Sequence, residues 1–286
     1  MNASDGRALE AGRASQSPEH VVLDWVRARP LVSFFVLAYA LNFGAYFPYL
    51  TIPGLVLAPF WLLGVFSPTI AALIVSGVVG GSAEVRRLLS GFARWRIGWH
   101  WFLAASTTVL IPLLLAIGYI GLGNEPVGPV AGTTVMLLAG QLVYTLLSGP
   151  LSEEAGWRGF ALPRLQQRHS ALTASVILGV IWTFWHVPVY FLPDATMIPL
   201  PMFLPMTIGL SILFAWVYNN TGGSLIATVL MHFSFNVSGA FLAGHLGLMP
   251  PMVLYIGGGI AIGLLTVAVV ASFGWRRLAR VPIAVS

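Results

Sequence analysis

Long apolar runs dominate this sequence, and their length decides what the chain can fold into. An α-helix rises about 1.5 Å per residue, so around 20 apolar residues span a hydrocarbon core of about 30 Å. Only 8% of the 286 residues are charged, whereas soluble domains carry roughly 25%. The sequence therefore predicts an all-α, polytopic transmembrane helical bundle with about eight spans, near 31–51, 55–80, 99–121, 133–157, 171–192, 201–218, 224–244 and 251–273.

The arginines indicate how such a bundle would be oriented. Cytoplasmic loops attract arginine and lysine, and translocated loops avoid them. All 14 basic residues are arginines, and with eight spans every one falls on the same side as the two termini. We therefore expect a multi-pass protein of the cell membrane, surrounded by the lipid bilayer, with both termini in the cytoplasm. The arginines form no stripe with interleaved aromatic residues, so we expect no nucleic-acid partner.

The chain is predicted to form one membrane domain with a short tail at each end. Residues 1–28 mix acidic and basic side chains without an apolar core, so we expect a disordered cytoplasmic tail there. The transmembrane domain covers 29–274, and 275–286 form a second cytoplasmic tail. Cysteine is absent, which excludes disulfides, thiolate metal sites and a cysteine nucleophile.

Two glutamates and an arginine stand near the end of the fourth predicted span. A charged side chain inside the bilayer costs at least about 2.5–3.5 kcal/mol, so such residues usually mark function. Glu154 and Arg158 are four residues apart and should pair on one helix face. Glu153 is turned about 100° away by the helical pitch and remains free to act as a general base. A solvated salt bridge at a cytoplasmic helix end explains the same residues equally well.

Two further spans carry histidine within apolar sequence. His186 follows Trp182 by one turn and precedes Pro188, which removes a backbone donor and should kink the helix. His232 and Asn236 stand one turn apart and share a face. Singly, each is also explained as a packing residue or a polar link between helices. Together with the charged residues of the fourth span they provide a general base, a water-orienting partner and oxyanion donors, the groups that amide hydrolysis requires.

In the order of these motifs the chain resembles the CPBP family of intramembrane endopeptidases, which includes the CAAX prenyl-protein proteases and the Abi proteins. The resemblance covers a motif core of 133–245. The family motifs are Glu-Glu-x-x-x-Arg, Phe-x-x-x-His and His-x-x-x-Asn, and this chain matches them with Glu153, Glu154 and Arg158, then Trp182 and His186, then His232 and Asn236. Trp182 departs from the family pattern, because it replaces a phenylalanine.

The resemblance implies a role for each of these residues. Glu153 and His186 would activate a water for attack on the scissile carbonyl, and His232 with Asn236 would hold the oxyanion. Glu154 and Arg158 would form the structural pair that fixes the glutamate-bearing helix. The implied activity is peptide-bond hydrolysis, without a covalent intermediate, in a cavity inside the bundle. The implied partner is a membrane-associated or prenylated protein or peptide.

Three alternatives remain open at this point. A zinc ion held by Glu153, His186 and His232 is chemically plausible, although we favour catalysis without a cofactor because the sequence has no His-Glu-x-x-His. A catalytically silent scaffold or bacteriocin-immunity protein of the same fold would keep the motifs without turnover. A small-solute transporter is the third alternative, but it would typically show internal repeats, and none is apparent.

The predicted spans create a conflict of depth. His186 would lie about 22 Å from the cytoplasmic start of its span, whereas Glu153 is close to the cytoplasmic end of its own. The site can assemble if the fourth helix continues inside the protein past Gly159, or if the fifth begins outside the membrane around Arg168. Gly156 and Gly159 would permit close helix packing there.

Overall fold

A computed structural model describes residues 18–52, 55, 57–192 and 197–280 of the chain, and this part is helical, with no β-strand. The α-helices are α2 (Pro18–Ala28), α3 (Pro30–Thr51), α4 (Leu57–Leu89), α5 (Trp99–Ser106), α6 (Leu110–Gly121), α7 (Val135–Leu147), α8 (Pro150–Glu154), α9 (Leu162–Gln166), α10 (Ala171–Trp185), α11 (Leu200–Asn220), α12 (Leu225–Ser238) and α13 (Pro251–Phe273). Two π-helices are η3 (Ala155–Ala161) and η5 (Gly239–His245), and the 3-10 helices are η1 (Ser90–Ala93), η2 (Thr107–Val109) and η4 (Val187–Phe191).

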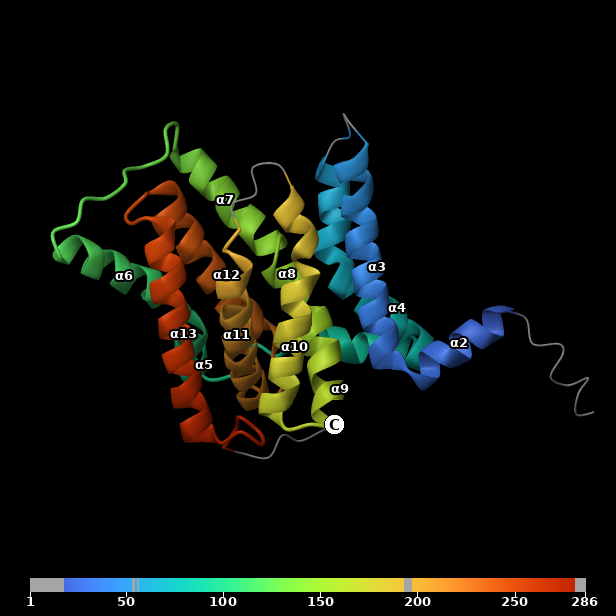
Figure 1. The fold of residues 1–286 in the computed structure, drawn as a ribbon. Helices are drawn as coiled ribbons and strands as arrows, with labels where there is room; N and C mark the ends of the chain where they lie inside the picture. Colours follow the sequence, from blue (N-terminus) through green and yellow to red (C-terminus); the bar gives the residue numbers. More distant parts are fainter. Residues whose placement is uncertain (1–17, 53–54, 56, 193–196, 281–286) are drawn as a thin grey trace, which may run out of the picture.

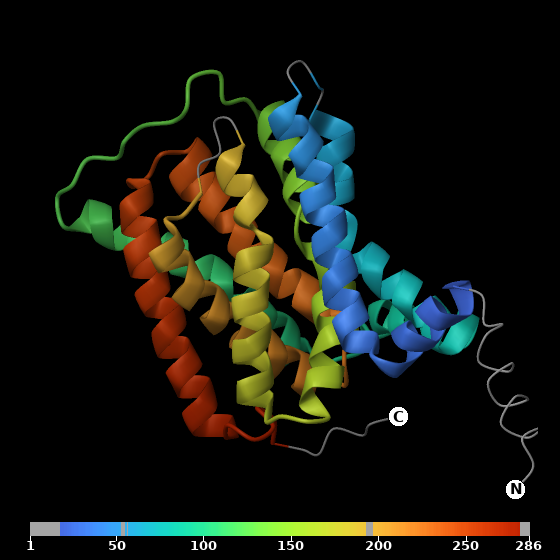
Figure 2. The same cartoon turned by 45° about the vertical axis from the view of Figure 1, so that its right-hand side comes forward.

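Eight helical stretches in the described residues are long and apolar enough to cross a membrane, which confirms the predicted number of spans. They form one bundle, with α13 at one side, α3 and α4 at the other, and α8 to α10 between them (Figures 1 and 2). The closest pairings along the bundle join α3 to α4 and α10 to α11. The short helix α8, which carries Glu153 and Glu154, therefore lies in the middle of the bundle.

The fourth span differs from its predicted limits of 133–157. It runs over Val135–Gln166, with a break at Ser148 and Gly149 between α7 and α8. The prediction ended too early because it took Arg158 for a residue at the cytoplasmic surface, whereas this side chain is 0% exposed. The helix thus continues past Gly159, which resolves the conflict of depth between the fourth and fifth spans.

Two glycines let the continued helix pack tightly against α4. A Cβ atom on Gly156 would lie 2.6 Å from the backbone carbonyl carbon of Pro68. A Cβ atom on Gly159 would lie 2.7 Å from Cδ1 of Leu88. Since both contacts are too close for any larger residue, the close packing predicted for these two glycines is confirmed.

The predicted tails need one correction. Residues 1–17 lie outside the described residues, but 18–28 form helix α2 rather than a disordered segment. Arg27 ties this helix to α4, because its Nε donates to the carbonyl oxygen of Val78 at 3.2 Å, and Val26 packs on the core. At the other end of the chain, the backbone after α13 is held by Asn219, whose side chain donates to the carbonyl oxygen of Arg277 at 2.8 Å.

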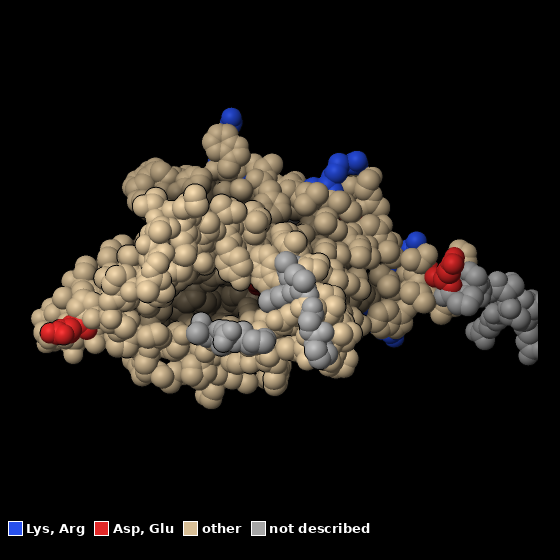
Figure 3. Space-filling model, turned by 90° about the horizontal axis from the view of Figure 1, so that it is seen from above, with Lys and Arg blue, Asp and Glu red and all other residues tan. Residues whose placement is uncertain are grey.

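The two ends of the bundle differ in charge. The lower end in Figure 1 carries α2 and the last turns of α9 and α13, where arginines gather. The opposite end, seen from above in Figure 3, is largely free of charged side chains and is hollowed near its centre. This contrast agrees with the predicted placement of the arginines at one side, except for Arg158, which is buried inside the bundle.

Candidate active site

The two glutamates end a short helix that begins abruptly inside the bundle. Helix α8 follows Gly149 and has Pro150 at its first position, where the missing backbone donor costs nothing. The π-helix η3 follows, with i→i+5 hydrogen bonds and therefore more residues per turn, a feature frequent at functional sites. Glu153 is 2% exposed and Glu154 is 0% exposed. The alternative interpretation from the sequence, a solvated salt bridge at a cytoplasmic helix end, is therefore wrong.

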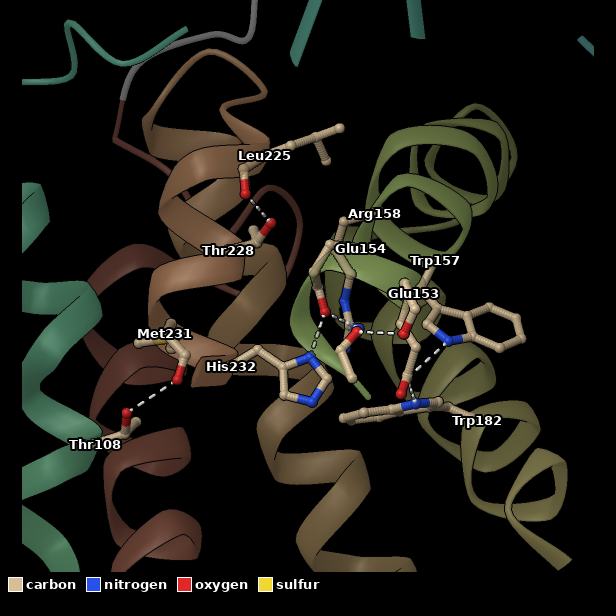
Figure 4. A network of polar contacts seen from close by, with 12 residues as sticks. Thr108, Glu153, Glu154, Trp157, Arg158, Trp182, Leu225, Thr228, Met231 and His232 are labelled. Carbon is tan, nitrogen blue, oxygen red and sulfur yellow. Dashed lines mark hydrogen bonds and ion pairs between the residues drawn. The ribbon is translucent and has the colours of Figure 1, made fainter. Parts of the chain in front are cut away.

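Glu154 joins the fourth span to the seventh. Its Oε1 accepts a hydrogen bond from Nη1 of Arg158 at 2.9 Å and one from Nδ1 of His232 at 2.8 Å. The predicted pair of Glu154 and Arg158 is thus present, and Figure 4 shows His232 pointing to the same carboxylate. The guanidinium of Arg158 lies between the rings of Trp182, at 4.6 Å, and Phe214, at 4.5 Å. Ion pairing and packing against aromatic rings together hold Glu154, Arg158 and His232 in place.

Glu153 is held by two indole rings. Nε1 of Trp182 donates to Oε2 of Glu153 at 2.6 Å, and Nε1 of Trp157 donates to the same oxygen at 3.2 Å (Figure 4). Neither hydrogen bond uses Oε1. Burying a carboxylate is costly unless donors satisfy it, and the two indoles do so from different helices. Oε2 is thereby fixed in place, while Oε1 accepts no hydrogen bond from the described residues.

Trp157 was not among the predicted site residues, and Trp182 was expected only as the residue that replaces the phenylalanine of the family motif. A signal for Trp157 existed in the sequence, because it follows Glu153 by four residues and shares its helix face. The donor role of Trp182 depends on a contact between helices, which the sequence does not contain. A phenylalanine, the family residue at this position, could not make this hydrogen bond.

His186 lies where α10 ends. Helix α10 ends where the kink at Pro188 was predicted. His186 is its C-cap residue, and the 3-10 helix η4 follows. Nδ1 of His186 is 2.8 Å from the carbonyl oxygen of Trp182. Because a carbonyl oxygen only accepts, Nδ1 carries the proton and Nε2 offers a lone pair. The ring also meets Trp185 and Phe203 edge to face, with centroids 4.9 and 5.1 Å away.

His232 and Asn236 converge on Gly149, at the break before α8. A Cβ atom on Gly149 would lie 3.0 Å from Nδ2 of Asn236 and 3.2 Å from Nε2 of His232. Two side-chain nitrogens on α12 therefore approach one point beside a residue that has no side chain. This point has the distances that an oxygen atom needs to accept from both. Gly149 was not predicted from the sequence, because nothing in its local pattern distinguishes it.

The six predicted site residues are thus brought together from the fourth, fifth and seventh spans. The ring of Trp182 lies between the two histidines, with centroids 5.6 Å from His186 and 5.4 Å from His232. Across the described ranges, no group of three or more histidine, aspartate or glutamate side chains is arranged to hold a metal ion.

Fold and site together define a polytopic helical membrane protein with a buried glutamate and histidine centre built from three spans. Residues 134–238 match the family described as "Type II CAAX prenyl endopeptidase Rce1-like", which supports the resemblance to the CPBP family. It is also 30% identical over 111 residues to a protein of Methanococcus maripaludis named "CAAX prenyl protease 2". That match covers 36% of this chain and 41% of the relative, so less than half of the relative's length is represented.

Proposed function

We propose that this chain is a CAAX-type intramembrane endopeptidase that cleaves a membrane-associated or prenylated protein or peptide. The observation that carries the proposal is the fixed carboxylate of Glu153, buried beside His186 and His232 in the middle of the bundle. The names of the matched family and relative supply the substrate class. Neither a structural role nor a lipid contact requires a buried carboxylate held by two indoles.

In the proposed reaction a water is activated between Glu153 and His186. Oε1 of Glu153 or Nε2 of His186 takes a proton from the water as its oxygen attacks the scissile carbonyl carbon. The carbonyl oxygen then carries the negative charge of a tetrahedral intermediate. Collapse of this intermediate breaks the C–N bond, and the proton passes to the leaving amine. The products are a carboxylate and a protonated amine, whose nitrogen has received both protons of the water, and no bond to the protein forms.

The point beside Gly149 is the proposed position of the oxyanion. Asn236 can donate there through Nδ2 in any protonation state of the site. His232 already donates through Nδ1 to Glu154, so it can donate through Nε2 only when the ring carries both protons. The carboxylate of Glu154 is placed to balance the charge of that imidazolium. Removing one such donor typically lowers kcat by about 10²–10³-fold.

We propose that the reaction needs no metal cofactor. The support is that the described ranges contain no group of three or more histidine, aspartate or glutamate side chains arranged to hold a metal ion. We further propose that the arginine-rich end of the bundle faces the cytoplasm, which places both termini there.

A cellular experiment separates this proposal from a catalytically silent scaffold or immunity protein. Membrane and secreted peptides are compared by mass spectrometry between cells that carry the native chain and cells that carry Glu153→Ala. A peptidase predicts full-length substrates that accumulate only in the Glu153→Ala cells. Unchanged peptides together with unchanged cellular function would favour the scaffold.

A further inference from the structure

The arginine-rich end of the bundle contains a cavity that is separate from the active site. Its volume is about 750 Å³, within the range of roughly 300–1,000 Å³ common for ligand pockets. The walls come from the first turn of α3, the end of α4, α9, the end of α11 and the segment after α13. None of the six predicted site residues lines it.

The charge of the lining is unbalanced. Seven arginines line the cavity, and Glu84 is the single carboxylate among the described residues that do so. Glu84 is shared by two of the arginines, because it accepts from Arg87 at 2.5 Å and from Arg164 at 2.6 Å. The remaining five, Arg29, Arg94, Arg168, Arg276 and Arg277, have no carboxylate within 4.0 Å in the described part of the chain. Gathering these charges favours an anion in the cavity.

Part of this cluster is held in place before any ligand arrives. Nη1 of Arg94 donates to the carbonyl oxygen of Gly222 in the turn between α11 and α12. A Cβ atom on Gly223 would lie 2.9 Å from the same nitrogen, so the glycine makes room for the guanidinium. A guanidinium with a fixed position and planar donors matches the geometry of phosphate oxygens.

The position of the cavity indicates where the anion comes from. Arg29 directly precedes the span of α3, and Arg276 and Arg277 follow the span of α13 within four residues. These are the levels at which a bilayer places its lipid phosphates. The lining also includes Leu31 and Val32 of α3, and Val32 is 48% exposed on the outer face. An acyl chain can therefore follow α3 while its headgroup lies among the arginines.

We propose that this cavity binds the phosphate headgroup of an anionic membrane phospholipid. The guanidinium groups bind the phosphate oxygens, and the lipid tail lies along the apolar start of α3. Basic pockets between membrane helices on the cytoplasmic side are suited to such headgroups. The site depends on charge at the bundle end and not on the chemistry of Glu153, so it stands independently of the proposed peptidase activity.

The test uses the full chain, purified in detergent and washed free of lipid, and measures binding by calorimetry. The probes are short-chain phosphatidylglycerol, short-chain phosphatidylcholine and inorganic phosphate. We expect phosphatidylglycerol to bind at least tenfold tighter than either of the others. Equal binding of the two lipids would overturn the proposal, and equal or tighter binding of inorganic phosphate would overturn the assignment to lipid.

Two charge-matched double variants locate the site. Arg168→Gln with Arg277→Gln removes two exposed guanidiniums of the lining, whereas Arg86→Gln with Arg96→Gln removes two exposed guanidiniums outside it. At about 1 kcal/mol per arginine, the first should weaken phosphatidylglycerol binding by about 10–30-fold and the second should not change it. Equal weakening in both would show general charge attraction and contradict the cavity. Thermal unfolding of each variant checks its fold, and phosphatidylglycerol retained by native mass spectrometry gives a second readout.

Discussion

Nε1 of Trp182 donates a 2.6 Å hydrogen bond to Oε2 of Glu153, and so connects the fifth span to the carboxylate on the fourth. The same indole lies beside Arg158 and between the rings of both histidines. In the proposed reaction Trp182 would be a positioning residue, because its hydrogen bond orients the Glu153 carboxylate while the indole takes no part in the bond changes.

Trp182→Phe is predicted to lower kcat by about 10–100-fold, the effect of losing a hydrogen bond of about 1–3 kcal/mol to a charged group. KM should change little, because the aromatic ring and its packing remain. Trp185→Phe is the matched control, since its Nε1 donates to Oγ of Ser67 and not to Glu153. Kinetics on a fluorogenic prenylated peptide measure both. Equal loss of kcat in the two variants would contradict the positioning role.

Gly149→Ala is predicted to abolish most activity while the protein stays folded. The new methyl group would occupy the point on which Nδ2 of Asn236 and Nε2 of His232 converge. The φ of Gly149 is −159°, which is outside the left-handed region that favours glycine. We expect a loss in kcat of about 10²–10³-fold, as for removal of an oxyanion donor. Gly140→Ala in α7, where nothing lies within 4 Å of the added atom, should leave kcat unchanged.

Arg158→Leu is predicted to destabilise the protein by about 3–5 kcal/mol, because it leaves the charge of Glu154 buried and uncompensated. The double variant Glu154→Gln with Arg158→Leu should recover part of that loss, since the uncompensated charge of Glu154 is removed as well. Thermal or denaturant unfolding in detergent measures the three proteins. A double variant less stable than Arg158→Leu alone would show that burial of an unpaired charge is not the cause.

Metal chelators are predicted to leave the activity of the purified protein unchanged. The reason is that no three histidine, aspartate or glutamate side chains among the described residues are arranged to hold a metal ion. The measurement is turnover before and after incubation with 1,10-phenanthroline or EDTA, combined with elemental analysis. Loss of activity that zinc restores would contradict metal-free catalysis and support the ligand set considered from the sequence.

The sequence predicted the number of spans and the residues of the site for different physical reasons. Span length and hydropathy are local properties, so the eight apolar runs were sufficient to predict the number of spans. The site residues stood out because ionisable groups are rare in hydrocarbon, and their order matched a known family. The end of the fourth span was wrong because the burial of Arg158 depends on Trp182 and Phe214, two residues on other helices.

Contacts between helices also explain what the sequence could not predict. The hydrogen bond from the indole of Trp182 to Glu153 requires a specific rotation of α10 against α8. The convergence of His232 and Asn236 beside Gly149 requires α12 to approach the break before α8. The arginine cavity gathers residues from five separate segments. In each case the amino-acid types were visible in the sequence, but their distances were set by the packing of the bundle.

The most direct test of the proposed peptidase is turnover of a prenylated peptide by the chain in lipid nanodiscs, compared with Glu153→Gln. Glutamine keeps the shape of Glu153 and can still accept from both indoles, but it cannot take a proton from water. We predict cleavage by the native chain and at least a 10²-fold lower rate for the variant, with equal thermal stability. Cleavage at the native rate by a folded Glu153→Gln protein would contradict the central role of this carboxylate.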